Sequence, residues 1–170
     1  MSGVDRIRDE TPDDRLVIES VTEAAFRTAP HAGHTEQFIV NALRVAGKLA
    51  VSLVAETNGI VIGHVAVSPV TISDGAENWF GVGPISVHPE HQHRGVGSAL
   101  MNEALRRLRE AGAAGCVVLG DPAYYRRFGF RAESGLVFPG VPPEYFQALS
   151  FTLKLPRGTV TYHEAFDAKA

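Results

Sequence analysis

The spacing of apolar residues changes several times along the chain and marks out its elements. Recurrence every three or four residues predicts a helix, whereas short alternating or continuous apolar runs between turn residues predict strands. The pattern predicts a strand at residues 4–8, helices at 12–29 and 36–46, strands at 49–56, 60–67 and 79–87, a helix at 96–111, a strand at 115–120, a short helix at 123–128, and strands at 151–155 and 159–163.

Turn and capping residues mark several of these boundaries. Pro30 is expected to break the first helix, and a loop beginning at His31 leads to the second. The Asn58-Gly59 pair predicts a tight hairpin between two strands. We find no internal repeat and no segment long enough to be a linker, so residues 1–170 are expected to form a single domain around a mixed sheet.

The composition limits the partners of this chain. Of its 170 residues, 45% are hydrophobic and 21% are charged, as is usual for a globular protein. The formal net charge of −3 provides no polybasic surface, so we expect no nucleic acid and no membrane as a partner. No apolar run begins the chain, which predicts no signal peptide. Cys116 is the only cysteine, which excludes an internal disulfide and favours a cytoplasmic location.

The loop at residues 92–97 carries the most informative motif. A strand ends before it at Pro89 and a helix begins after it, so Gly95 and Gly97 lie where the chain enters a helix. Glycine lets a ligand approach main-chain N–H groups, and the first turn of a helix has unpaired N–H groups at the positive end of its dipole. The loop is therefore predicted to bind a phosphate group.

Three kinds of phosphate-binding loop can be compared with this motif. A P-loop requires a lysine that this loop does not have, and a dinucleotide-binding loop requires a third glycine after the first strand of its unit. The pattern Gln/Arg-x-x-Gly-x-Gly/Ala fits residues 92–97 without a gap. This pattern is motif A of the GNAT N-acetyltransferases, which the chain resembles here.

The resemblance extends over nearly the whole chain. Residues 120–130, Gly-Asp-Pro-Ala-Tyr-Tyr-Arg-Arg-Phe-Gly-Phe, are similar to the YhbS-like branch of bacterial acetyltransferases, as are residues 142–146 and 160–163. The family implies the GNAT acyl-CoA N-acyltransferase fold, an α+β fold with a central splayed mixed sheet and helices on both faces. It also implies transfer of the acetyl group of acetyl-CoA to a primary amine of a small molecule or protein, by direct attack in a ternary complex. No metal is implied, and a homodimer is an open alternative.

The same resemblance assigns the site residues. Gly81, Gly83 and Pro84 favour a bulge or bend that would open the strand before the motif. Tyr125 stands four residues before Gly129 and matches the tyrosine that protonates the leaving coenzyme sulfur, with the adjacent Tyr124 as a weaker alternative. The residues expected to hold acetyl-CoA are Ile85, Ser86, Val87, Gln92, His93, Arg94, Gly95, Val96, Gly97 and Ser98.

The general base stays open at this point. Some family members carry a glutamate in the strand before motif A, whereas residues 79–84 contain no carboxylate and Glu77 stands only at their start. A water relay, Glu23 and His34 are the alternatives. The function is open in two further respects, because a non-catalytic acyl-CoA-binding module or a transferase of another acyl group would share these motifs.

Other reactive side chains have simpler interpretations. His88, His91 and His93 invite a metal-site interpretation, but their loop is already assigned to the pyrophosphate, so we expect no metal. His64 lies in an apolar strand and is expected to be a hydrogen-bonded core histidine. Cys116 stands among valines and is expected to be inert.

Overall fold

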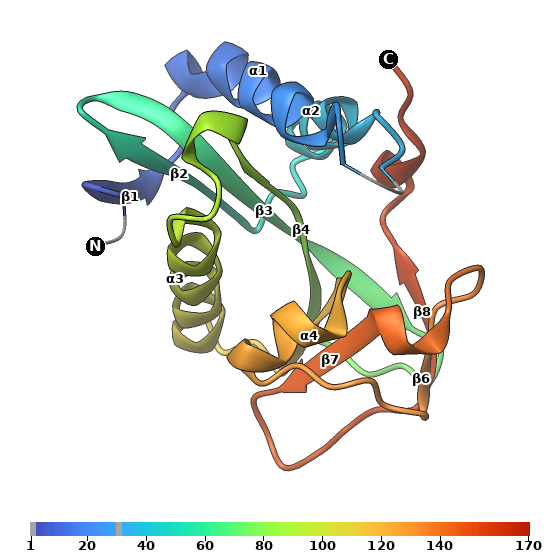
Figure 1. Ribbon diagram of the computed structural model, residues 1–170. Helices are drawn as coiled ribbons and strands as arrows, with labels where there is room; N and C mark the ends of the chain where they lie inside the picture. Colours follow the sequence, from blue (N-terminus) through green and yellow to red (C-terminus); the bar gives the residue numbers. More distant parts are fainter. Residues whose placement is uncertain (1–2, 30–31) are drawn as a thin grey trace.

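The computed structural model describes residues 3–29 and 32–170 (Figure 1). Its strands are β1 (Arg6–Asp9), β2 (Val51–Thr57), β3 (Ile60–Ile72), β4 (Trp79–Val87), β5 (Gly115–Leu119), β6 (Leu136–Val137), β7 (Phe146–Ser150) and β8 (Gly158–Tyr162). Its α-helices are α1 (Arg15–Phe26), α2 (Glu36–Val45), α3 (Val96–Glu110) and α4 (Pro122–Tyr125). The 3₁₀ turns are η1 (Pro12–Asp14), η2 (Pro89–His91), η3 (Arg126–Phe128), η4 (Pro143–Tyr145) and η5 (Glu164–Asp167).

The strands form one mixed sheet, as predicted. Its order is β1-β2-β3-β4-β5-β7, with β8 paired to the last residues of β3 and β6 paired to β8. The β2–β3 hairpin is confirmed: Asn58 and Gly59 have φ angles of 51° and 75°, the left-handed conformation that this turn requires. Strand β3 lies at the centre and continues to Ile72, beyond its predicted end, because its last residues pair with β8.

Helices cover both faces of the sheet (Figure 1). On one face, Leu100 of α3 packs in a cluster with Leu53 of β2. On the other face, Ile18 of α1 packs in a cluster with Val54 of the same strand. Successive residues of β2 therefore point into separate hydrophobic layers, and burial of each such side chain contributes about 1.5–3 kcal/mol. The predicted arrangement, a sheet between two helical layers, is confirmed.

Strands β4 and β5 run side by side over only a short distance and then separate. They pair in parallel over three residue pairs, the last of which joins Gly81 to Val117. Residues 82–87 continue along β3 but have no strand on their other edge in the part of the chain that the structure describes. The register with β3 shifts between Val65 and Val67, which marks a bulge in β4. The predicted opening of the sheet is therefore present, and we call residues 82–87 the free edge of β4.

The predicted strand at residues 151–155 is wrong. The segment that pairs with β5 is β7, which ends at Ser150. The Ser150 hydroxyl donates to the carbonyl of Lys154 at 2.6 Å and accepts from the N–H of Thr152 at 3.2 Å. These local bonds turn the chain, and Leu153 is fully exposed. An alternating apolar pattern therefore occurs here without a sheet partner.

Other boundaries differ by less. The short strand β6 was not predicted, because no apolar pattern marks its two residues. Helix α1 ends at Phe26, and the residues that were expected to break it and open the next loop, Pro30 and His31, lie outside the described residues. Within residues 3–29 and 32–170, no helix is both long enough and apolar enough to cross a membrane.

Candidate active site

The loop before α3 has the backbone conformation that its glycines predict. Gly95 is the N-cap of α3 with a φ of 85°, and His93 has a φ of 63°. A side chain on Gly95 would meet nothing within 4 Å, so this position faces open space. The N–H groups of the first turn, from Val96 to Ser98, have no partner inside the helix. These donors and the helix dipole make the loop suitable for binding an anion.

Side-chain hydrogen bonds hold the loop against the strand before it. The Gln92 side chain donates from Nε2 to the carbonyl of Val87 at 3.0 Å, which ties the loop to the end of β4. The His88 main-chain N–H donates to the carbonyl of Ile62 at 2.8 Å, and its ring Nδ1 accepts from the N–H of Glu90 at 3.2 Å. The position of the anion-binding loop relative to the free edge of β4 is thereby fixed.

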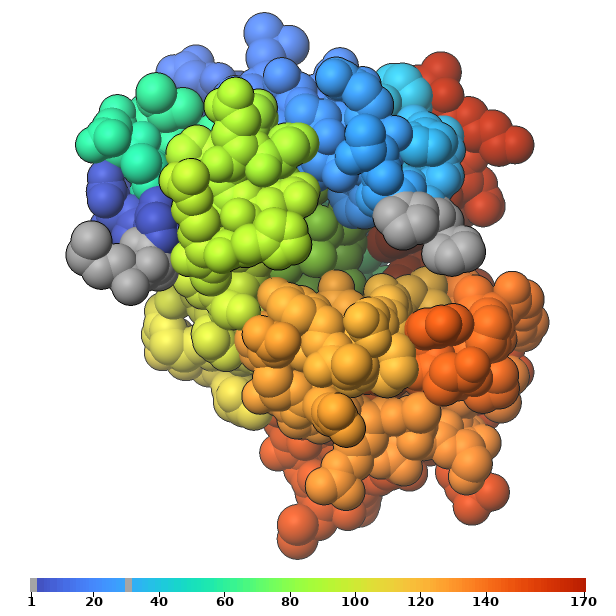
Figure 2. Space-filling view, in the orientation of Figure 1, coloured from blue at the N-terminus to red at the C-terminus, as the bar shows by residue number. Residues whose placement is uncertain are grey.

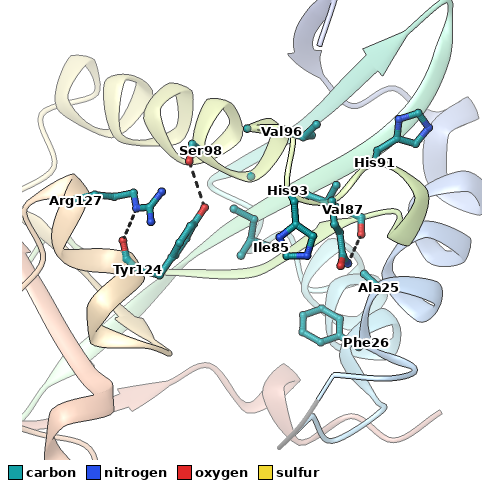
Figure 3. A pocket seen from close by; sticks show the side chains of 13 residues that line it. Ala25, Phe26, Ile85, Val87, His91, His93, Val96, Ser98, Tyr124 and Arg127 are labelled. Carbon is teal, nitrogen blue, oxygen red and sulfur yellow. Dashed lines mark hydrogen bonds between the residues drawn. The ribbon is translucent and has the colours of Figure 1, made fainter. Parts of the chain in front are cut away.

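A cavity of about 630 Å³ lies between this loop and the free edge of β4 (Figure 3). Figure 2 shows a hollow between the part of the surface formed by α1 and α3 and the part formed by α4 and the following chain. Eight of the ten residues predicted to hold acetyl-CoA line the cavity: Ile85, Val87, Gln92, His93, Gly95, Val96, Gly97 and Ser98. The other two do not, because Ser86 is buried opposite His64 on β3 and Arg94 is exposed.

Five lining residues were not predicted for the donor. They are Ala25, Phe26, His91, Tyr124 and Arg127. The first two come from the last turn of α1, which reaches the cavity from the other side of the sheet. Tyr124 had been named only as the alternative acid, and the signal for Arg127 was its place beside that tyrosine motif, since a cation near a phosphate group is a candidate ligand. The two α1 residues are ordinary apolar residues of an amphipathic helix and carry no signal of their own.

Tyr124 points into the cavity. Its hydroxyl lies 3.4 Å from Ser98 Oγ, and the guanidinium of Arg127 lies over its ring, 4.4 Å from the ring centre (Figure 3). Arg127 also donates from Nε to the carbonyl of Tyr124 at 3.0 Å. A phenol and a cation are thus held together beside the first turn of α3.

Tyr125 lies behind its neighbour. Its ring covers Gly120 and packs edge-to-face against Phe130, and it is not among the residues that line the cavity. Burial raises the pKa of Tyr125 to about 12, and the nearby Tyr124 and Asp121 act in the same direction. The assignment of Tyr125 as the general acid stays a prediction, and the geometry makes Tyr124 a stronger alternative than its sequence position suggested.

Comparison with known proteins identifies the family. The acetyltransferase (GNAT) domain matches residues 48–132, which contain the loop, the free edge of β4 and both tyrosines. The chain belongs to the GNAT acetyltransferase family. It is 34% identical to the N-acetyltransferase YhbS of Escherichia coli K12, over 95% of this chain and 98% of that protein.

Solved structures of the same family are similar over nearly the whole chain. A GNAT family acetyltransferase from Brucella melitensis, crystallised in complex with acetyl-CoA, is 49% identical with a TM-score of 0.85, over 95% of this chain and 97% of that one. YhbS from Escherichia coli, crystallised in complex with CoA, is 35% identical with a TM-score of 0.87, over 97% and 93% of the two chains. The predicted α+β GNAT fold is therefore confirmed, and so is the prediction that the chain is an acetyltransferase of this family.

None of the carboxylate or histidine alternatives for the general base lines the cavity of this GNAT protein. Glu23 is half-exposed on α1 and paired with Arg27, away from the cavity lining. Glu77 is exposed in the turn before β4. His34 is exposed in the loop before α2, with a left-handed φ of 61°. The positions of these three residues therefore do not identify the general base.

The remaining reactive side chains lie away from the cavity. His64 is fully buried and its Nε2 lies 2.8 Å from Ser52 Oγ, which confirms a hydrogen-bonded core histidine. Cys116 is also fully buried, and burial raises the pKa of its thiol. In the described residues, no three His, Cys, Asp or Glu side chains converge as metal ligands.

Proposed function

We propose that this chain transfers the acetyl group of acetyl-CoA to a primary amine of a small molecule or protein, by direct attack of the amine in a ternary complex. This proposal rests on one observation: a single cavity extends from the N-terminal end of α3, which is suited to an anion, to the free edge of β4. A donor with a pyrophosphate at one end and an amide-containing arm at the other needs both features side by side. The relatives crystallised with acetyl-CoA and with CoA support the same donor.

In this proposal the donor is held mainly by the backbone. The N–H groups of residues 95–98 bind the pyrophosphate, and the nearby guanidinium of Arg127 supplies positive charge. Arg94 is exposed beside the loop and adds a second cation at its outer edge. The main chain of residues 85–87 pairs with the amide arm, in the place of the strand that is missing from the free edge.

The chemical step needs a donor for the leaving sulfur. We assign this role to Tyr125, with Tyr124 as the alternative because it faces Ser98 across the cavity. At a pKa of about 12, Tyr125 stays protonated throughout the physiological range. Full proton transfer from it to a thiolate of ordinary pKa would be uphill by about 5 kcal/mol, so its contribution is a hydrogen bond that stabilises the departing sulfur. We assign stabilisation of charge on the thioester oxygen to a main-chain N–H near Ile85, a residue that lines the cavity.

Two measurements test the proposal. Calorimetry with acetyl-CoA is expected to show binding at one site, and a thiol-release assay over a panel of polyamines, amino acids and lysine peptides is expected to show release that depends on the amine. Longer acyl-CoA donors in the same assay test whether acetyl is preferred. Absence of binding would overturn the donor assignment. Thiol release at the same rate with and without any amine would instead indicate a thioester hydrolase.

A further inference from the structure

The cavity lacks a carboxylate that could accept a proton. The only histidines among its lining residues are His91 and His93, and both lie on the loop assigned to the pyrophosphate. An amine that forms an amide must give up protons, so a transferase of this kind needs an acceptor within reach of the reaction centre. Such an acceptor must therefore lie outside the lining of the cavity.

A four-residue polar network lies behind the central strands. Glu10 is held by Arg44 through two hydrogen bonds of 2.8 and 3.0 Å, and it accepts a further bond from the Ser52 hydroxyl. Ser52 Oγ also lies 2.8 Å from Nε2 of His64, which in turn lies 3.8 Å from Glu10 Oε1. The network therefore runs from a half-buried ion pair to a fully buried imidazole.

This geometry fixes the tautomer of His64. An ionised carboxylate only accepts hydrogen bonds, so the single proton of Ser52 is donated to Glu10. Ser52 must then accept from His64, which places the ring proton on Nε2 and leaves Nδ1 with a bare lone pair. A carboxylate that orients one ring nitrogen and leaves the other free is the arrangement that general bases use.

Unpaired hydroxyls lie on the same face of the sheet as the free nitrogen, or on the helix that covers that face. In the described part of the chain, Nδ1 of His64 is buried without a partner, as are the hydroxyls of Ser86, Ser68 and Thr22. Ser86 is the direct cross-strand partner of His64, so their side chains lie on the same face of the sheet. Buried polar atoms without protein partners are usually joined by ordered water.

Two of these hydroxyls lie on the face of the sheet that α1 covers. Ser86 stands between Ile85 and Val87 on β4, so its side chain points away from theirs, towards α1. Helix α1 in turn lines the cavity through Ala25 and Phe26. Thr22 precedes the lining residue Ala25 by one turn of α1. A row of polar groups therefore extends from the free edge of β4 to His64. From there it continues through Ser52 to a surface cavity of about 340 Å³ that Glu10 and Arg44 help to line.

We propose that His64 accepts the proton of the acceptor amine through Ser86 and buried water; this rests on the proposed acetyl transfer. As the C–N bond forms, the N–H bond breaks, its electron pair stays on nitrogen, and the C–S pair leaves with the thiolate. The proton passes to Nδ1 of His64, and the imidazolium keeps its Nε2–H bond to Ser52. Release to solvent follows through the surface cavity, so His64 is a relay residue that does not touch the substrate.

The charges around His64 suit a transient role. Burial lowers the pKa of the imidazole, while Glu10 raises it, Arg44 lowers it and Asp14 in η1 raises it. The facing group on β2 is the uncharged Ser52. The ring is therefore neutral at rest, and a carboxylate stands ready to offset the charge that a proton brings.

Kinetics of matched variants test the relay, in thiol release with an amine that the wild type acetylates. His64→Gln and Ser86→Ala are each expected to lower kcat about tenfold or more near pH 7, with the KM for acetyl-CoA unchanged. The deficit is expected to shrink as the pH rises, because solvent base then removes the proton that the amine nitrogen loses on attack. Ser86→Ala removes a buried hydroxyl that has no partner, so it folds even if His64→Gln does not. A wild-type pH profile in Ser86→Ala would overturn the relay.

A second pair of variants, at Glu10 and Glu56, distinguishes loss of the relay from the general effect of losing an ion pair. The side chains of Glu10 and Glu56 are both 15% exposed and both pair with an arginine, but only Glu10 reaches Ser52 and His64. Glu10→Gln is expected to reproduce the pH-dependent deficit, whereas Glu56→Gln is expected to keep the wild-type profile. Identical profiles in the two variants would show that Glu10 acts only on stability and would contradict the relay.

Nitrogen NMR tests the geometry without an acceptor. In ¹⁵N-histidine-labelled protein, His64 is expected to show a protonated Nε2 and a bare Nδ1, with Nδ1 shifting when acetyl-CoA is added. The opposite tautomer would overturn the relay. If the wild type binds acetyl-CoA but acetylates no amine, the proposed function fails at the acceptor, while the NMR result still decides the state of His64.

Discussion

A glutamate at Gly95 is expected to abolish most of the affinity for coenzyme A. Gly95 faces open space at the start of α3, so the new side chain causes no clash. Its carboxylate would stand beside the phosphates, and two like charges about 5 Å apart repel by about 3 kcal/mol at an effective dielectric constant of about 20. This corresponds to roughly a 100-fold loss of affinity, which salt would reduce by screening.

The backbone strain of the same change can be measured separately. Gly95 and Gly75 have φ angles of 85° and 86°, and a side chain on either would meet nothing within 4 Å. Gly75 lies in the turn between β3 and β4, away from the cavity. Both glutamate variants are expected to lose about 1–2 kcal/mol of unfolding free energy, since a left-handed non-glycine residue costs that much.

Calorimetry with coenzyme A at low and high salt, beside thermal unfolding of both variants, separates the two effects. Gly75→Glu is expected to bind as the wild type does. If folded Gly95→Glu protein also binds normally, the pyrophosphate does not lie at this helix end. If Gly75→Glu loses affinity to the same extent, the loss reflects stability rather than charge at the site.

Three further predictions concern other parts of the molecule. Tyr125→Phe is expected to lower kcat with unchanged affinity for coenzyme A, and steady-state kinetics beside Tyr124→Phe decide between the two phenols; an effect only in Tyr124→Phe would transfer the acid role. The Arg8 guanidinium holds the pKa of Asp14 at about 2, although burial alone would raise that pKa. The stability that the ionised carboxylate contributes is therefore fully present above its ordinary pKa of about 3.8 and is lost as the pH falls towards 2. Chemical denaturation at several pH values should therefore show Asp14→Asn less stable by about 2 kcal/mol near pH 7, with the difference fading below pH 4; a constant difference would refute this. Gly115→Ala would place a Cβ against the ring of Trp79 and 2.7 Å from the main-chain carbonyl oxygen of Leu149, and thermal unfolding is expected to show a loss of about 2 kcal/mol; an unchanged midpoint would mean that the ring and β7 both move freely.

The binding loop could be predicted from sequence because its signals are local. Glycines at 95 and 97, a proline that ends the strand and a helical pattern that follows lie within a few residues of one another. The opening of the sheet was predicted in the same way, from Gly81 and its neighbours, and the register confirms it. By contrast, Ala25 and Phe26 reach the cavity only because α1 packs across β4, and nothing in their own segment indicates that position.

Adjacent residues on a short helix are a second limit. Each residue turns the side-chain direction by about 100°, so Tyr124 and Tyr125 point in different directions, and the motif does not specify which of them faces the cavity. The polar network behind β4 was missed for a related reason. His64 was predicted as a core histidine, but its partners Ser52 and Glu10 come from other strands and loops, and only the sheet register brings them together.

The free edge of β4 has a consequence for the dynamics of the empty and occupied protein. Main-chain N–H groups on that edge that point away from β3 exchange with solvent unless something pairs with them. A donor whose arm lies along residues 82–87 is expected to slow their deuterium uptake, while the amides of the β2–β3 hairpin stay as they were. Because that binding stabilises only the folded chain, the melting temperature would rise with donor concentration. Before the donor binds, this enzyme has an incomplete sheet, and in the proposed complex the donor takes the place of the missing strand.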